Sequence, residues 1–308
     1  AIIILLIMVV IVSIVITITN LTDGSFFRSD KKQFIICDTD IGQDPGDMYA
    51  ISRLLLEENL ELKGITTVHR MLYRSARDHS AKKSYEIALK LIGSLKKESV
   101  KVISGAETMF HPEENIHSPQ PAADFIIDLC NNTSPKRKVI VFCMGPLTNI
   151  ANAIKKEPSI SSKLILYFSG TIYESKTRIW NKNEFNVKND LDAFDFIINE
   201  TEAELRIIPF NLSSKLHFND DEYSELINEN VTFATLLDEL YHSFEMKEKQ
   251  TAEELALVEV YLHEKFGGYK NVTSPPENIQ KSIKVYYTLN YELMKADFLS
   301  VHKRDEYD

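Results

Sequence analysis

The feature that most constrains this chain is a series of short apolar runs that alternate with segments of helical periodicity. Six runs predict strands, over residues 34–37, 62–68, 100–104, 139–143, 164–168 and 205–209. They are continuous rather than alternating, which is typical of strands buried on both faces. Helix-like segments lie between them, over residues 47–58, 74–95, 122–130, 147–155 and 191–200. The pattern predicts a three-layer, Rossmann-like α/β fold with a mostly parallel central sheet.

The C-terminal third of the chain is less regular. Residues 220–266 have a largely helical pattern, and the stretch "SIKVYYTLNY" predicts a late strand. No internal repeat interrupts the chain, so we expect one domain over residues 33–308, preceded by a polar linker over residues 20–32. The net charge of -10 argues against nucleic acid as a partner, because a phosphate backbone would be repelled.

Residues 1–19 are apolar throughout and carry no charge. Their length lies between that of a long secretory h-region and that of a membrane span, so a cleaved signal peptide and a signal anchor both remain open. Either would bring the protein into the secretory pathway, as a secreted or membrane-anchored protein. The basic residues Arg28, Lys31 and Lys32 argue the other way, since positive charges tend to hold their side of a span in the cytosol.

Glycosylation sequons support the secretory interpretation. Seven N-x-S/T sites occur where chance would give roughly two or three, so a glycoprotein is expected, although an Asn-rich genome is the alternative explanation. The sites are Asn20, Asn131, Asn132, Asn199, Asn211, Asn230 and Asn271. The three cysteines are too few for a disulfide framework, and we expect buried core thiols.

The stretch "FIICDTDIGQDPGDMYAI" holds four aspartates directly after the first predicted strand, Asp38, Asp40, Asp44 and Asp47. Ligands bind beyond the carboxyl ends of strands in such a sheet, and the acidic loop falls at that edge. Four carboxylates in one loop repel each other unless a cation or protons neutralise them. Hard oxygen ligands favour Ca²⁺ or Mg²⁺, whereas a solvated acidic loop is the plainer alternative.

Two known loop types fit this stretch poorly. An EF-hand needs Gly at loop position six and Glu at position twelve, where this chain has Gln43 and Tyr49. A haloacid-dehalogenase-type phosphatase also begins with an apolar strand and D-x-D, and "ICDTDIG" partly matches it. That class needs a late strand followed by a paired acidic motif, which is not found, so the phosphatase stays an alternative.

A third comparison fits better. The segment "DTDIGQDPGDMYA" resembles the N-terminal signature of the inosine-uridine preferring nucleoside hydrolase family, and later segments resemble that family in the same order. These segments are "LKGITTV", "VKVISGAETMFHP", "VIVFCMGPLTNIANAI", "LILYFSG", "NEFNVKNDLDAFDFI" and "LRIIPFNLS". The "GPLTNIA" block is the most specific of them. The resemblance covers roughly residues 34–213 and implies a fold of the nucleoside hydrolase type.

The resemblance implies a calcium-dependent N-ribosyl hydrolase, which cleaves the bond between ribose and a nucleobase. It makes Asp40 a metal ligand and the general base, Asp47 a second metal ligand, and the backbone carbonyl of Met144 a further one. Asp38 becomes a supporting carboxylate of the substrate site. Glu184 and Asn186 of "EFN" become hydrogen-bond partners of the ribose hydroxyls, for which an ordinary polar loop is the alternative.

The chain also departs from the family. Gly46–Asp47 stands where the family has two adjacent aspartates, and Asp44 is the substitute expected to bind substrate. The family's late histidine-aspartate motif aligns best with "TAEELALVEVYL". This alignment puts Glu253 in place of the metal-binding Asp and Ala252 in place of the His that acts as general acid. His242 is then a candidate for the acid, against a surface or packing role.

Two functions follow from this comparison. The first is a calcium-dependent nucleoside hydrolase with reduced or altered activity. The second is a non-catalytic secreted or membrane-anchored glycoprotein that keeps the fold. Family members are often dimers or tetramers, so a homo-oligomer is expected from the resemblance alone.

Overall fold

The computed structural model describes residues 33–42, 44–70, 79–113, 119–134, 136–229, 231–244 and 250–302. The expected signal segment over residues 1–19 and the linker over residues 20–32 lie outside this part of the chain. Within it, no helix combines the length and the hydropathy that a membrane span requires.

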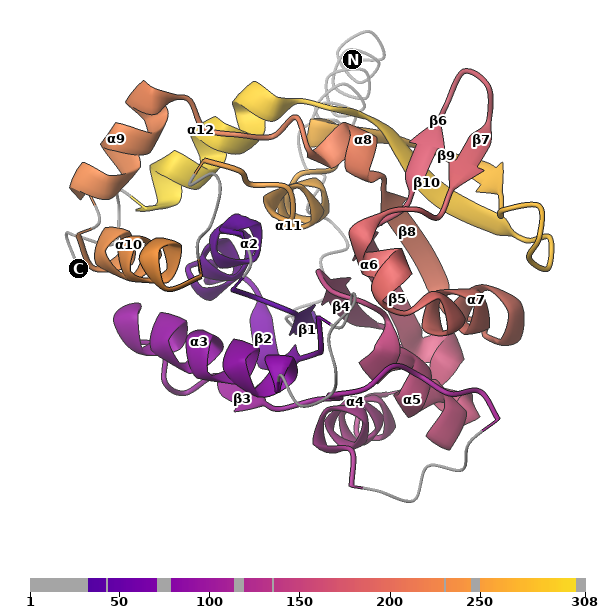
Figure 1. Cartoon of the computed structure of the whole chain (residues 1–308). Coiled ribbons are helices and arrows are strands. Elements are labelled where there is room, and N and C mark those ends of the chain that lie inside the picture. The colour runs from indigo at the N-terminus through magenta and orange to yellow at the C-terminus, as the bar shows by residue number, and fades with distance from the viewer. Residues whose placement is uncertain are drawn as a thin grey trace, which may run out of the picture. The chain divides into compact units, whose positions relative to one another are not determined.

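An eight-stranded sheet forms the centre of the fold, in the order β3-β2-β1-β4-β5-β8-β10-β9 (Figure 1). The pairings are parallel except for β9, which runs antiparallel to β10. The strands are β1 (Phe34–Thr39), β2 (Glu61–Thr67), β3 (Lys101–Ile103), β4 (Val139–Cys143), β5 (Leu164–Ser169), β8 (Glu204–Ile208), β9 (Gly267–Thr273) and β10 (Ser282–Leu289). The predicted α/β architecture with a mostly parallel sheet is therefore confirmed.

Helices cover both faces of the sheet, and each face has its own apolar core. Successive side chains of β1 point to opposite faces, so Ile35 and Cys37 join one core and Ile36 joins the other. The first core is covered by α2 (Gly46–Leu55), α3 (Ser80–Ser94), α9 (Asp220–Glu229), α10 (Val231–Phe244), α11 (Leu255–Leu262) and α12 (Tyr291–His302). The second is covered by α4 (Pro121–Asn131), α5 (Thr148–Lys156) and α7 (Leu191–Glu200).

The thiol prediction is confirmed, because Cys37, Cys130 and Cys143 are free and buried. Several elements were not predicted. They include the hairpin of β6 (Ile172–Glu174) and β7 (Ile179–Asn181), strand β9 and helix α12. The hairpin strands have three residues each and β9 opens with two glycines, so none of them forms an apolar run.

Candidate active site

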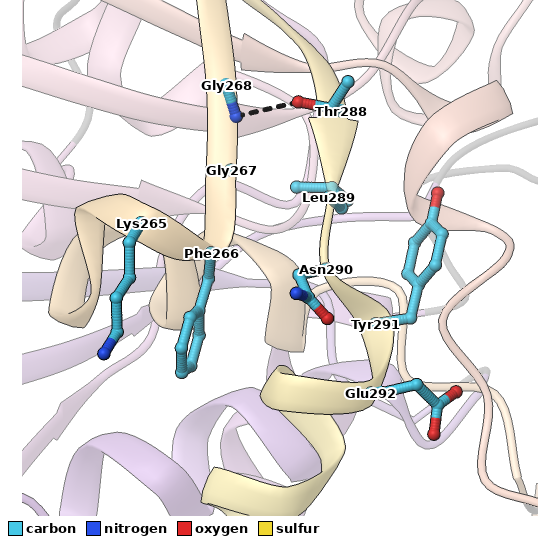
Figure 2. A pocket seen from close by; sticks show the side chains of 9 residues that line it. All are labelled: Lys265, Phe266, Gly267, Gly268, Thr288, Leu289, Asn290, Tyr291 and Glu292. Carbon is cyan, nitrogen blue, oxygen red and sulfur yellow. Dashed lines mark hydrogen bonds between the residues drawn. The ribbon is translucent and has the colours of Figure 1, made fainter.

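Two hollows in the described part of the chain differ sharply in chemistry. The larger, of about 510 Å³, lies where β9 and β10 meet α12 (Figure 2). Its charged side chains are Lys265 and Glu292, which lie apart, and its hydrogen bond from the Gly268 N–H to the Thr288 hydroxyl is internal at 3.1 Å. The smaller, of about 200 Å³, is lined by six carboxylates. Convergent ionisable groups mark a reactive site better than volume does, so the smaller cavity is the candidate.

This cavity opens at the carboxyl ends of four neighbouring strands. Asp40 follows β1, Met144 follows β4, Ser169 ends β5 and Phe210 follows β8. These strands are adjacent in the sheet order β1-β4-β5-β8, so residues far apart in sequence meet at one edge. The full lining is Asp40, Asp44, Asp47, Met144, Ser169, Glu184, Phe185, Asn186, Phe210, Glu253 and Glu254.

Short-range hydrogen bonds hold the aspartate loop. The Thr39 hydroxyl donates to Asp47 Oδ2 at 2.9 Å and accepts from the Ile41 N–H at 3.0 Å. Asp47 lies in the first turn of α2, where the helix dipole favours a negative charge. Asp44 is exposed at the cavity mouth and accepts from the Gly46 N–H at 3.0 Å. The loop thus aims three carboxylates at one small volume.

The buried carboxylates of the loop resist ionisation. Burial raises the pKa of Asp40 to about 8, with Asp44 adding to the rise and the Arg70 guanidinium opposing it. Burial, together with the charges of Asp40 and Asp44, raises the pKa of Asp47 well above its usual value. Among the described residues, no Lys or Arg forms an ion pair with either Asp40 or Asp47. Within the described part of the chain, these two acids are therefore without an ion-paired cation, and the Arg70 guanidinium acts to lower their pKa values without forming an ion pair with either.

The "EFN" loop borders the same cavity, and its polar side chains mostly form hydrogen bonds with backbone groups. Glu184 caps α6 (Phe185–Asn189) by accepting from the N–H groups of Asn186 at 2.9 Å and Val187 at 3.1 Å. The Asn186 side-chain amide donates to the carbonyls of Met144 at 2.8 Å and Ser169 at 2.9 Å. These bonds tie the ends of β4 and β5 together and leave the Asn186 amide oxygen as the side-chain atom that can accept a further hydrogen bond.

Glu254 is the lining carboxylate that sequence reasoning missed. It immediately precedes α11, is 8% exposed, and accepts from the Ser169 hydroxyl at 3.2 Å. Burial and the nearby charges of Asp44 and Asp47 raise its pKa well above the usual value. The predicted residue Glu253 also lines the cavity but is only half-buried. The adjacent acids of "TAEELA" were the available signal, and they left the choice between the two open.

Comparison with known proteins agrees with this geometry. The profile of the family "Inosine-uridine preferring nucleoside hydrolase" matches residues 35–273.

The chain belongs to this family.

Individual nucleoside hydrolases and nucleosidases are distant relatives. Uridine nucleosidase 1 of Arabidopsis thaliana is 26% identical over 215 residues, which cover 64% of this chain and 62% of that protein. Probable uridine nucleosidase 2 of Oryza sativa subsp. japonica is 29% identical over 120 residues, which cover 38% of this chain and 34% of that protein. The chain thus spans less than two thirds of the length of these relatives.

Solved structures share the nucleoside hydrolase fold. A plant nucleoside hydrolase, PpNRh1, superposes with a TM-score of 0.68 at 16% identity, covering 89% of this chain and 99% of that one. A purine-preferring ribonucleoside hydrolase from Gardnerella vaginalis gives a TM-score of 0.66 at 18% identity, with the same coverage. The match therefore extends beyond the segment that the sequence resemblance covered.

Two residues expected at the site lie elsewhere. Asp38 is fully buried and outside the cavity lining, where its Oδ1 accepts from Thr66 Oγ1 at 2.5 Å and from the Asn149 amide at 2.8 Å. Its hydrogen bonds hold the end of β1 against β2 and α5, and this placement gives no support to a direct contact with substrate. His242 lies on α10 with 71% of its side chain exposed, 3.6 Å from the Asp238 carboxylate, and is not part of the lining. This placement gives no support to its predicted role as the acid.

Proposed function

We propose that the protein is a calcium-dependent N-ribosyl hydrolase that cleaves nucleosides into ribose and base. The observation that carries the proposal is the cavity itself, in which the buried carboxylates of Asp40, Asp47 and Glu254 meet at the carboxyl ends of the central strands, with no ion-paired Lys or Arg among the residues that the structure describes. Membership of the nucleoside hydrolase family supports the reaction class. Secretion, glycosylation and oligomerisation remain predictions from the sequence.

The donor set fits a hard divalent cation. The cavity offers carboxylate oxygens and the Met144 carbonyl, and no described lining residue is a His or Cys. Ca²⁺ takes six to eight oxygen ligands, whereas Zn²⁺ prefers nitrogen and sulfur. We expect Asp40, Asp47 and the Met144 carbonyl to hold the cation. When bound, it would orient a water molecule and ribose hydroxyls and lower the pKa of that water.

The side chains then divide the chemistry between them. Asp40 takes the proton of the attacking water, the role that the family resemblance implies for this aspartate, and its carboxylate lines the cavity. As the base departs, the sugar becomes an oxocarbenium-like cation, which the surrounding negative charge of the cavity stabilises. The Asn186 amide oxygen accepts from a ribose hydroxyl. Phe185 and Phe210 supply aromatic surface at the mouth, where Phe210 is 40% exposed and free to stack on a base.

Protonation of the leaving base is the weak step. Among the described lining residues, none is a His, Lys, Arg or Tyr. Loss of a general acid typically costs about 10²–10⁴ in rate. We therefore expect substrates with good leaving groups to react far faster than natural purine and pyrimidine nucleosides.

The proposal is tested by hydrolysis of p-nitrophenyl riboside, uridine and inosine, each with calcium chloride and with excess EGTA. We expect turnover that EGTA abolishes and calcium restores, with the nitrophenyl riboside as the fastest substrate. Asp124→Asn, on an exposed carboxylate of α4 that pairs with Lys156, is the matched control and should be unaffected. Calcium binding without turnover of any riboside would support the non-catalytic alternative.

A further inference from the structure

One buried carboxylate oxygen in the cavity has no hydrogen-bond partner among the described residues. Glu254 is 8% exposed, and its Oε1 accepts from the Ser169 hydroxyl at 3.2 Å. Its Oε2 is buried, and no hydrogen-bond donor of the described residues reaches it. A buried carboxylate oxygen without a donor is costly, so this atom indicates a ligand that the fold itself does not provide.

Gly46 explains how this carboxylate enters the cavity. A Cβ placed on Gly46 would lie 2.0 Å from Glu254 Oε2 and 3.1 Å from Asp44 Oδ1. The backbone of Gly46 is not left-handed, since the only glycine with positive φ is Gly42 among the residues that the structure describes. Gly46 is therefore needed for space and not for conformation. Any side chain at residue 46 would compete with Glu254 for the same volume.

Helix packing sets this arrangement. Gly46 begins α2 and Glu254 immediately precedes α11, and these two helices pack against each other. Their N-terminal ends therefore meet at the cavity and bring Glu254 beside Asp47. Asp47 comes from the first turn of α2, and both helix ends favour negative charge.

We propose that Glu254 supplies a ligand oxygen to the divalent cation of the cavity, from the volume that a side chain at residue 46 would otherwise fill. Gly46 and Glu254 are thus a matched pair, in which the missing side chain of one admits the carboxylate of the other. The proposal rests on the cation site of the proposed function. It makes Glu254 Oε2 a direct ligand of that cation and places Glu253 outside the set of direct ligands.

The test is a calorimetric Ca²⁺ titration of the full chain and of five variants at constant pH. Glu254→Gln keeps the shape of the side chain and should weaken Ca²⁺ binding at least about 10-fold, whereas Glu253→Gln should weaken it less. Gly46→Asp should weaken binding similarly, because two carboxylates would compete for one place. The double variant Gly46→Asp/Glu254→Ala should bind within a few-fold of the wild type, since one carboxylate again fills that place. Glu239→Gln, on an exposed acid of α10, is the control.

Equal Ca²⁺ affinity of Glu254→Gln and the wild type would overturn the proposal, as would a double variant that binds no better than Gly46→Asp alone. Circular dichroism of each variant separates loss of binding from loss of fold, and the isosteric Glu254→Gln decides the case if the double variant does not fold. Riboside turnover by the wild type is scored separately. A wild type that binds Ca²⁺ without turnover contradicts the proposed function and leaves this inference standing.

Discussion

Helices α2 and α11 carry a cluster of buried acids at each end of their contact, and the two clusters are neutralised differently. At the N-terminal end, Asp47 and Glu254 face the cavity and, among the described residues, form no ion pair with a Lys or Arg. At the C-terminal end, Arg53 of α2 is 2% exposed and lies among three carboxylates. One helix pair therefore builds two acid clusters, of which one contains a buried guanidinium and the other has no ion-paired Lys or Arg among the described residues.

The Arg53 cluster supplies its own counter-charge. The guanidinium bonds to Asp297 at 2.8 Å and to Glu57 at 3.0 Å, and lies 3.4 Å from Glu259. Burial raises the pKa of Glu259 to about 9, against the lowering effect of Arg53, so this acid keeps its proton at neutral pH. A guanidinium and a retained proton together balance the cluster.

The presence of a guanidinium in only one of the two clusters suits one cluster to stability and the other to function. Acids that are paired with a buried guanidinium hold helices together, whereas we propose that the acids of the cavity bind an external cation. The following predictions would break or sharpen this comparison.

The largest effect is expected from Asp40→Asn in the cavity. It removes the proposed base and a cation ligand, so kcat/KM for p-nitrophenyl riboside should fall by about 10²–10⁴. In EGTA the free energy of unfolding should not fall with it, because the folded chain keeps the Asp40 proton at neutral pH and Asn replaces this uncharged acid with a group of similar shape. Unchanged kinetics would separate Asp40 from the chemistry.

Arg53→Met should have the largest effect on stability. It leaves the partly buried carboxylates of Glu57 and Asp297 without their counter-ion, and breaking a buried pair costs about 3–5 kcal/mol, which sets the upper limit here. Urea unfolding with saturating Ca²⁺ measures this loss. Lys90→Met removes an exposed partner of Glu239 and should cost less than about 1 kcal/mol, which makes it the matched control. A similar cost for both variants would show that Arg53 is not the centre of a buried cluster.

The metal-free protein should lose stability as the pH rises. Asp40 titrates near 3.8 when unfolded and at about 8 when folded, so between these values the folded chain keeps a proton that the unfolded chain has released. The free energy of unfolding in EGTA should therefore fall from about pH 4 to about pH 8, by up to about 6 kcal/mol, because each unit of pKa difference is worth about 1.4 kcal/mol. Calcium should make the decline shallower at its upper end. If calcium leaves the decline unchanged, the calcium ion does not bind at the cavity that contains Asp40.

The smallest effect is expected from His242→Ala. His242 is exposed on α10 and close to Asp238, outside the cavity lining. Turnover of uridine and of p-nitrophenyl riboside should change less than about 2-fold, in keeping with a surface substitution. A selective loss of about 100-fold on uridine alone would restore His242 as the acid, since the nitrophenyl leaving group needs no proton.

The sheet and the aspartate loop could be predicted because their signals are local. Strands buried on both faces leave continuous apolar runs, and β4 begins and ends as expected, at Val139 and Cys143. Asp40, Asp44 and Asp47 come from one short stretch, so their meeting needs no knowledge of packing. Strand β9 was missed because it is mostly polar, begins with Gly267 and Gly268, and pairs at the sheet edge.

The rest of the site depends on tertiary packing. Glu254 reaches the loop from more than two hundred residues along the chain, through the contact of α11 with α2. The sequence offered Gly46 as a missing carboxylate and an acidic pair at residues 253–254, but did not show that one fills the place of the other. His242 was a candidate for the general acid because of its nearness in sequence, with a surface role as the alternative, and on α10 its side chain is exposed to solvent.

The central claim is that the cavity cluster, and not the Arg53 cluster, binds the cation. A crystal structure from crystals soaked in calcium chloride tests it most directly. We predict one ion in the cavity, at about 2.3–2.6 Å from oxygens of Asp40, Asp47 and Glu254 and from the Met144 carbonyl. A cavity that stays without an ion, or an ion bound between Glu259 and Asp297 instead, would contradict the account.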